Sequence, residues 1–217
     1  MTIKILLADD HKITRDGLRV LLQEQADMEV IGEADSGRAA VELAYRLAPD
    51  VIIMDISMPV MNGIEATRRI VAKAPQIKII ALTMYSDKRY VVEMLKAGAL
   101  GYVNKMCKYE DLAMAIRTVI VQKTYFCPRE LKTISKEYTN TLPKKQPSVF
   151  SVLTPREREV LQIVAEGKTT RQIASILSVS VKTIETHRQQ IMKKLGINSI
   201  AELTKYAIRE GLTSVEG

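Results

Sequence analysis

Four short apolar runs in this chain are each followed at once by side chains able to handle a phosphoryl group. The runs are partly β-branched and are separated by helix-like segments, which is the pattern of a parallel α/β sheet. In such sheets, ligands bind outside the carboxyl ends of the strands. One pocket is therefore predicted to collect the side chains that follow these runs, namely Asp9, Asp10, Asp55, Thr83 and Lys105.

These residue types suit phosphoryl transfer assisted by Mg²⁺. Magnesium prefers oxygen ligands and needs only one or two protein carboxylates, because it keeps several waters. Three acids packed without a cation would repel one another and raise at least one pKa. Asp55 is the predicted nucleophile, since a carboxylate can form an aspartyl phosphate. Lys105 would neutralise the phosphoryl oxygens, and Thr83 would donate a hydrogen bond to one of them.

The elements that must position these residues alternate five times along residues 1–122. The second strand is the most alternating in polarity, which favours an edge position. The predicted strands are 3–8, 28–34, 51–54, 78–82 and 101–104. The predicted helices are 12–25, 36–47, 63–73, 89–97 and 108–122.

The charge of the chain is unevenly spread. Of its 217 residues, which carry a net charge of +7, residues 1–122 hold 16 basic and 16 acidic side chains. Residues 123–150 hold 6 basic and 2 acidic side chains, and residues 151–217 hold 10 and 7. The whole positive excess therefore lies beyond residue 122, which suggests a polyanion partner for the carboxyl-terminal part.

The composition also argues against a membrane-spanning or secreted protein. No apolar run approaches the ~18 residues of a membrane span. Asp9 and Asp10 interrupt the apolar run at the amino end, which argues against a secretory signal. The two cysteines, Cys107 and Cys127, lack metal-ligand spacing and are expected to be reduced thiols. A cytoplasmic protein with no membrane partner is expected.

Residues 123–150 are predicted to be a linker, since 140–148 is polar and contains two prolines. Pro128 could open a short helix within this linker. From Thr154 onward no strand pattern appears. Capping residues and glycines predict four helices instead, over 155–167, 170–177, 181–195 and 199–210.

The helices at 170–177 and 181–195 have the proportions of a helix-turn-helix. One face of the longer helix is apolar except for Arg188 and is predicted to pack inward. A helix with one polar face is more often merely solvated, so composition alone does not decide its role. The opposite face carries side chains that can reach phosphates and base edges, namely Lys182, Glu185, Thr186, Gln189 and Lys193.

The stretches LLADDH (6–11) and VIIMDISMPVMNG (51–63), together with Thr83, Tyr102 and Lys105, resemble the receiver domains of two-component response regulators. The resemblance covers residues 1–122. It implies a flavodoxin-like fold, with a five-stranded parallel sheet of order 2-1-3-4-5. It also implies that Asp55 is the phospho-acceptor and that Asp9, Asp10 and Asp55 hold Mg²⁺ with the backbone carbonyl of Ser57.

The same resemblance implies roles for residues around the acceptor. Side chains at Ser57 and Tyr85 would flank the phosphoryl group and tune its lifetime. Thr83 and Tyr102 match the switch pair of the family: Thr83 would move toward the phosphoryl group, and Tyr102 would swing into the vacated space. The alternative is that Tyr102 is a static, half-buried side chain.

Residues 153–197 closely resemble the LuxR-type DNA-binding domain. A receiver followed by this domain resembles the NarL/FixJ type of regulator. The likeness implies that the base-reading residues are Glu185, Thr186 and Gln189. It implies that the phosphate-contacting residues are Lys182, Thr183, Arg188, Lys193 and Lys194. His187 belongs to the motif, and contact with a phosphate or packing at the helix margin both remain open. The helix at 199–210 would serve dimerisation.

The predicted domains are therefore a receiver at 1–122, a linker at 123–150 and a DNA-binding domain at 151–217. The predicted function is a transcriptional regulator that a sensor histidine kinase phosphorylates on Asp55, and that binds promoter DNA as a dimer through residues 181–195. It would not be an enzyme beyond its own phosphotransfer and dephosphorylation. Two alternatives remain: a metal-dependent phosphatase, and a DNA-binding protein that does not depend on phosphorylation.

Overall fold

The computed structural model describes residues 2–84, 88–126 and 149–213. The chain divides into two compact units, Met1–Leu142 and Pro143–Gly217. The predicted helix after Pro128, Cys127 and the predicted role of Tyr85 lie outside the described residues. Within the described ranges, no helix is both long and apolar enough to cross a membrane.

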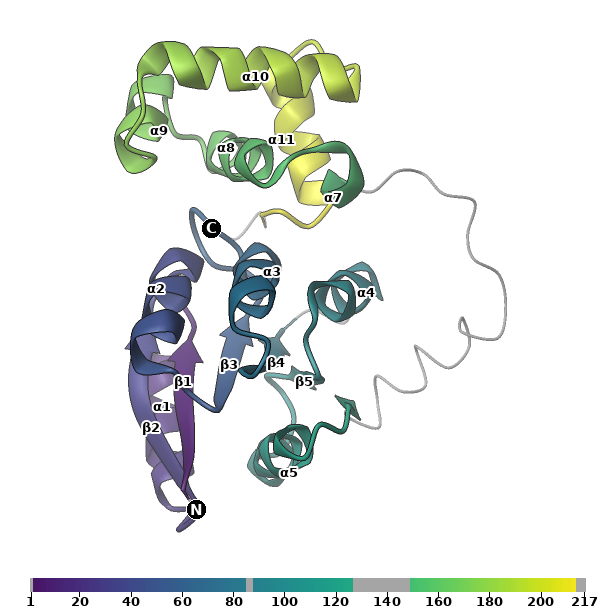
Figure 1. The fold of residues 1–217 in the computed structure, drawn as a ribbon. Coiled ribbons are helices and arrows are strands. Elements are labelled where there is room, and N and C mark those ends of the chain that lie inside the picture. The colour runs from purple at the N-terminus through teal and green to yellow at the C-terminus, as the bar shows by residue number, and fades with distance from the viewer. Residues whose placement is uncertain (1, 85–87, 127–148, 214–217) are drawn as a thin grey trace, which may run out of the picture. The chain divides into compact units, whose positions relative to one another are not determined.

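The first unit is built on a parallel sheet of six strands in the order β2-β1-β3-β4-β5-β6 (Figure 1). The predicted order 2-1-3-4-5 and the edge position of β2 are confirmed. The strands are β1 (Ile3–Ala8), β2 (Met28–Ala34), β3 (Val51–Asp55), β4 (Lys78–Thr83), β5 (Gly101–Asn104) and β6 (Tyr125–Phe126).

The sixth strand corrects the prediction of five, and it lies within the segment expected to be linker. The chain turns at Gln122, whose φ is 59°, and the Tyr125 N–H then donates to the Leu100 carbonyl at 2.9 Å. The pair Tyr125–Phe126 continues this contact alongside Gly101 and Tyr102 of β5. Two residues are too few for a polarity pattern, which explains why the sequence did not indicate this strand.

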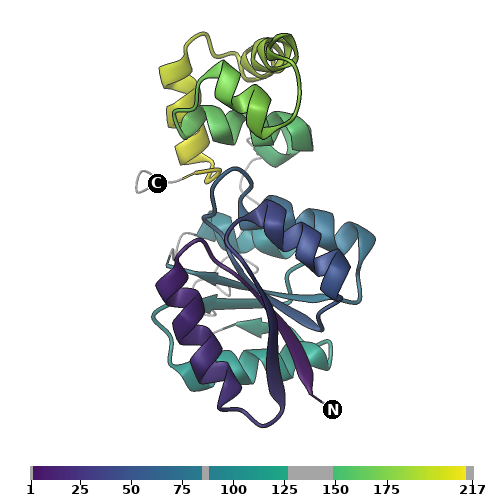
Figure 2. The same cartoon turned by 90° about the vertical axis from the view of Figure 1, so that its left-hand side faces the viewer.

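Helices cover both faces of the sheet, with α1 and α5 on one face and α2, α3 and α4 on the other (Figures 1 and 2). The α1/α5 face is packed with buried side chains such as Ile5, Ile53 and Ile116. The central strand β3 is buried along its whole length, as expected for a strand covered on both faces. The helices are α1 (Lys12–Gln23), α2 (Gly37–Leu47), α3 (Gly63–Lys73), α4 (Lys88–Ala97) and α5 (Tyr109–Ile120).

A glycine makes the turn after β3 possible. The Gly63 N–H donates to the Ile56 carbonyl at 2.9 Å, so α3 begins hard against the end of the strand. A Cβ at Gly63 would lie 2.0 Å from the Asp55 carbonyl oxygen, closer than any side chain can approach. The Asn62 side chain caps α3 by accepting from the Glu65 N–H at 2.9 Å. This close turn holds the end of β3 and its carboxylate in place.

The second unit is helical, and hydroxyl caps begin four of its helices. Thr154, Thr169, Ser180 and Ser199 accept from backbone N–H groups three residues later, and the sequence predicted all of these caps except Ser180. The short helix α7 was not predicted, because four residues show no period. The helices are α7 (Val149–Val152), α8 (Pro155–Ala165), α9 (Thr170–Ile176), α10 (Val181–Leu195) and α11 (Ile200–Arg209).

Val60, in the loop between β3 and α3, adopts a left-handed backbone conformation with φ at 67°. A β-branched residue is a true outlier there, because its Cβ crowds the backbone. Such strain costs about 1–3 kcal/mol and persists only where the surroundings impose it. The loop that follows the predicted phospho-acceptor is therefore held under strain.

We expect Val60→Gly to raise the free energy of unfolding of the first unit by about 1 kcal/mol, because glycine adopts positive φ without strain. Urea unfolding followed by circular dichroism would measure the gain. Gly63→Ala, at the first residue of α3, should instead destabilise, because its Cβ would collide with the Asp55 carbonyl. A Val60→Gly variant less stable than the wild type would show that side-chain packing of Val60 outweighs its backbone strain.

Candidate phosphoryl site and nucleic-acid interface

The structure brings the predicted acids together at the carboxyl edge of the sheet. Asp9, Asp10, His11 and Asp55 each offer a ligand atom, and these atoms all lie within 4.8 Å of one another. The neighbouring parallel strands β1 and β3 cause this, since Ala8 and Met54 are register partners just before the acids. Asp9 and Asp55 are buried, whereas Asp10 is exposed.

Lys105 reaches both buried carboxylates. Its Nζ lies 2.7 Å from Asp9 Oδ2 and 2.8 Å from Asp55 Oδ2. The end of β5 is fixed next to β4, because the Lys105 N–H donates to the Thr83 carbonyl at 2.7 Å. Thr83 is fully buried at the end of β4. Segments nearly a hundred residues apart thus form one charged pocket.

The electrostatics of this pocket leave a surplus of negative charge. Burial raises the pKa of Asp55 to about 6; Lys105 opposes the shift, and the nearby charges of Asp9 and Asp10 add to it. Burial lowers the pKa of Lys105, but the attraction of Asp55 and Asp9 outweighs burial and the net pKa is raised. Lys105 therefore stays charged, and one cation faces three carboxylates.

The donor set fits Mg²⁺. Carboxylate oxygens are the hard ligands that magnesium takes, and a divalent cation would offset the surplus negative charge. Asp9, Asp10 and Asp55 would hold the ion. The Ser57 N–H lies 3.4 Å from Asp55 Oδ1, so the residue expected to lend its carbonyl is next to the carboxylate. The ligand role of that carbonyl stays a prediction.

The sequence reasoning missed Arg15, which fastens the loop carrying the two amino-terminal acids. Its Nη1 donates to the Asp9 carbonyl at 2.6 Å, and its Nε pairs with Glu33 Oε2 at 3.2 Å. The side chain is only 13% exposed. A basic residue in the first turn of the helix that follows the acid pair was the signal that could have found it. Arg15 thus ties β1, through Glu33, to the end of β2.

His11 was also missed. Its Nδ1 lies 2.8 Å from Asp10 Oδ1 and 3.3 Å from Asp9 Oδ1, and its side chain is exposed. Tyr102, predicted to be mobile or half-buried, is almost completely buried in β5. The structure holds one position of Tyr102, so the switch of Thr83 and Tyr102 stays a prediction.

In the helical unit, five of the nine predicted DNA-contacting residues are exposed along one face of α10. The structure pairs Lys182 Nζ with Glu185 Oε2 at 3.7 Å, and both side chains remain accessible. An exposed polar face on the longer helix of a helix-turn-helix is the arrangement that reads a major groove. The residues exposed on this face are Lys182, Glu185, Thr186, Gln189 and Lys193; Lys194 is exposed as well but lies off this face.

Of the remaining predicted DNA-contacting residues, Thr183, Arg188 and Lys194 have hydrogen bonds or ion pairs within the protein. Thr183 bonds with the Ser180 cap through its backbone N–H and its hydroxyl. Arg188 Nη1 donates to Thr170 Oγ1 at 2.9 Å, which joins α10 to the start of α9. Thr183 and Arg188 would have to give up these hydrogen bonds, or share them, to contact DNA phosphates.

His187 lies at the helix margin. Its Nδ1 is buried, with no hydrogen-bond partner among the described residues. This position favours the packing alternative over direct contact for that nitrogen.

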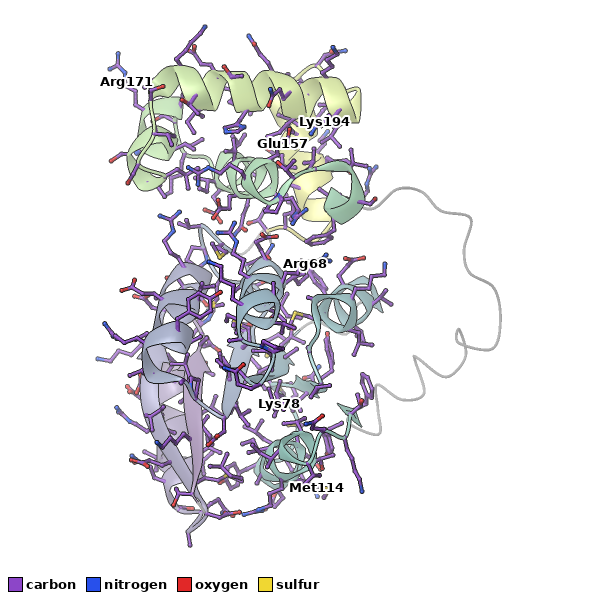
Figure 3. The ribbon with its side chains drawn as sticks, in the orientation of Figure 1. Arg68, Lys78, Met114, Glu157, Arg171 and Lys194 are labelled. Carbon is purple, nitrogen blue, oxygen red and sulfur yellow. The ribbon has the colours of Figure 1, made fainter. Side chains whose placement is uncertain are left out.

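Lys194 has a structural partner that the sequence did not reveal. Its Nζ lies 2.7 Å from Glu157 Oε2, and Figure 3 shows the two residues facing each other between α10 and α8. Glu157 also accepts from the Thr154 N–H at 2.8 Å. Burial raises the pKa of Glu157, but the Lys194 ammonium and Thr154 donors outweigh it and hold the pKa below its ordinary value. This ion pair fastens α10 to α8.

Arg171, on α9, is a further cation that the sequence reasoning overlooked. It is exposed and points away from the helices near the start of α10 (Figure 3). An exposed arginine next to the polar face of α10 suits a backbone phosphate if that face meets DNA. Its place in the first turn of a short capped helix was the available signal.

Comparison with known proteins matches both units. Residues 5–117 match the family model described as response regulator receiver domain, and residues 151–207 match bacterial regulatory proteins of the luxR family. The oxygen regulatory protein NreC of Staphylococcus carnosus is 40% identical over 214 residues, covering 97% of this chain and 99% of the relative. NreC of Staphylococcus epidermidis is 39% identical over 215 residues, with the same coverage.

The chain is a two-component response regulator of the NarL/FixJ family. The receiver match spans the acid pocket, and the luxR match spans α8, α9 and α10. Solved structures agree: RcsB of Salmonella typhimurium is 29% identical with a TM-score of 0.60, covering 94% of this chain and 98% of that one. A complex of RcsB with DNA has 29% identity and a TM-score of 0.58, covering 95% and 98%.

The raised pKa of Asp55 predicts that, without metal, this regulator becomes less stable as the pH rises and Asp55 ionises. A carboxyl whose pKa is raised from 3.8 to about 6 contributes stability that is lost as the pH rises through about 6. In EDTA, Asp55→Asn should therefore be more stable than the wild type above pH 6, by about 1–3 kcal/mol.

The difference should shrink as the pH falls toward 3.8, where the wild-type carboxyl is protonated. Thermal unfolding of both proteins across this pH range would measure it. Added Mg²⁺ should stabilise the wild type more than Asp55→Asn. Equal stability of the two proteins at all pH values would show that Lys105 already balances the buried charges.

We expect Arg15→Gln to weaken Mg²⁺ binding by about tenfold, because groups that hold ligands in place typically contribute this much to metal affinity. Titration calorimetry with the full chain would measure the affinity. Arg19→Gln is the matched control: Arg19 also pairs with Glu33, at 2.9 Å, but has no bond to the Asp9 carbonyl. Equal losses in both variants would point to a general charge effect.

Lys193 and Lys194 are neighbours with different predicted roles. Lys193→Ala should weaken binding to all DNA sequences and reduce the salt slope by about one unit. Lys194→Ala should instead destabilise the helical unit by about 2 kcal/mol, because Glu157 loses its partner.

Lys194 stabilises the helical unit only while Glu157 is ionised, and the pKa of Glu157 is lowered from 4.5. The stability that Lys194 supplies should therefore be lost progressively as the pH falls below about 4.5 and Glu157 becomes protonated. Salt-dependent DNA binding and urea unfolding of both variants would separate the two roles. Unchanged stability of Lys194→Ala would contradict the structural role.

Proposed function

We propose that this response regulator accepts a phosphoryl group on Asp55 from a sensor histidine kinase, with Mg²⁺ bound, and then binds promoter DNA as a dimer through α10. The observation that supports this most strongly is the placement of Lys105 Nζ within 2.8 Å of the buried Asp55 carboxylate and next to two further acids. A phosphoryl acceptor needs this combination of a nucleophilic carboxylate and a fixed cation.

The transfer forms a bond between an Asp55 oxygen and phosphorus while the phosphorus–nitrogen bond of the donor phosphohistidine breaks. Mg²⁺, when bound, neutralises negative charge that builds up on the phosphoryl oxygens. Lys105 loses one carboxylate partner when Asp55 is modified and can turn its ammonium to the phosphoryl oxygens. Thr83, at the neighbouring strand end, is the proposed hydroxyl donor. The protein thus acts on itself and has no separate substrate to turn over.

The DNA half of the proposal rests on α10. Its exposed face carries Lys182 and Lys193, and α9 adds Arg171 at one end. α11, with Ile200 48% exposed, is the proposed dimer contact. A dimer would place two copies of α10 in successive turns of the major groove. DNA as partner implies work in the cytoplasm. Because the staphylococcal relatives are named for oxygen regulation, oxygen supply is the first stimulus to test.

The proposal is tested with the full chain and a small phosphodonor. Incubation with acetyl phosphate and Mg²⁺ should add the mass of one phosphoryl group at Asp55, and Asp55→Asn should gain none. Genome-wide DNA capture before and after treatment should show sites that the treated wild type binds more tightly.

Three results would count against it. Absence of the adduct would remove the phosphoryl half. Equal DNA capture by treated wild type and Asp55→Asn would indicate a binding protein that does not depend on phosphorylation. Steady turnover of a phosphomonoester, lost in Asp55→Asn, would indicate a phosphatase.

A further inference from the structure

We infer that two neighbouring residues of α10 select base pairs by different chemistry: Glu185 selects a cytosine, and Thr186 selects a thymine through its methyl group. The inference rests on the proposed DNA-binding role of α10 and specifies which bases its exposed face prefers. It depends on how the structure uses the polar atoms of these two side chains.

The hydroxyl of Thr186 already donates a hydrogen bond within α10. Its Oγ1 donates to the Lys182 carbonyl, one turn earlier, at 3.0 Å. A hydroxyl has one hydrogen to give, so Thr186 cannot donate to a base without breaking this bond. The exposed side chain still presents its methyl group and a hydroxyl oxygen that can only accept. In the major groove, the apolar feature that a methyl group can contact is the C5-methyl of thymine.

Glu185 offers only acceptors when ionised. Its side chain is 50% exposed and lies on the same face, one turn after Lys182. Guanine presents acceptor atoms N7 and O6 in the major groove and thymine presents O4, so a carboxylate is repelled by both. The N4 amino group of cytosine is a donor without a neighbouring acceptor. Cytosine is therefore the base that this carboxylate accepts best.

Lys182 makes a carboxylate tolerable near DNA. Its Nζ lies 3.7 Å from Glu185 Oε2, and the lysine side chain is 85% exposed. A bare carboxylate would be repelled by the phosphates, whereas a paired one approaches as a nearly neutral unit. Lys182 is also long enough to turn toward a phosphate while keeping the pair. The two residues act together: Lys182 supplies charge, and Glu185 supplies the choice of base.

The test is selection from DNA with a randomised binding site, using the full chain treated with acetyl phosphate and Mg²⁺. The wild type should enrich sites with one position fixed as cytosine and another as thymine. Glu185→Gln should lose the preference for cytosine at one position by about tenfold, because an amide also bonds well to adenine. The thymine position should not change in Glu185→Gln.

Thr186 allows a matched pair of variants. Thr186→Val keeps the methyl group and removes the hydroxyl, so the thymine preference should persist. Thr186→Ser keeps the hydroxyl and removes the methyl group, so that preference should fall by several-fold. Replacing the selected thymine with deoxyuridine, which lacks only the methyl group, should weaken binding of the wild type and leave Thr186→Ser unaffected.

The outcomes separate this inference from the proposed function. If the wild type enriches a site but Glu185→Gln keeps its cytosine, or Thr186→Val loses its thymine while Thr186→Ser keeps it, the inference is wrong and DNA binding stands. If the wild type enriches no sequence at all, the proposed function fails together with the inference.

Discussion

The contact of one ammonium group with two buried carboxylates organises the receiver. Asp9 and Asp55 carry like charges in a desolvated pocket, and Lys105 lies within 2.8 Å of both. Without a nearby cation, burial of two ionised acids would cost several kcal/mol. Since Lys105 comes from β5 and the acids from β1 and β3, the pocket exists only when the sheet has assembled in its observed order.

The surroundings of the pocket are built to hold these charges in place. Gly63 lets α3 begin against the Asp55 carbonyl, where any side chain would collide. Arg15 fastens the loop of Asp9 from the other side. Val60 keeps a left-handed conformation in the loop between β3 and α3. Backbone strain of this kind persists only where the surrounding packing imposes it.

The helical unit shows how one residue type takes two roles. Lys193 and Lys194 are adjacent on α10, yet Lys194 meets Glu157 on α8 whereas Lys193 is exposed. Arg188 is likewise fixed by Thr170 of α9. By bonding to α8 and α9, Lys194 and Arg188 hold α10 in one orientation. This leaves the exposed side chains Lys182 and Glu185 to present a fixed pattern of charge.

The sequence alone determined five strands of the receiver, the boundaries of most helices and the set of acids with Lys105, because apolar periodicity and strand ends are local features. The order of these strands followed from the resemblance to receiver domains, since pairing between strands is not local. Its limits lay where a partner is distant in the chain. Arg15, the strand at Tyr125–Phe126 and the pair of Lys194 with Glu157 depend on neighbours that only folding supplies. Charge and periodicity indicate which residues can interact, but packing in three dimensions decides which of them meet.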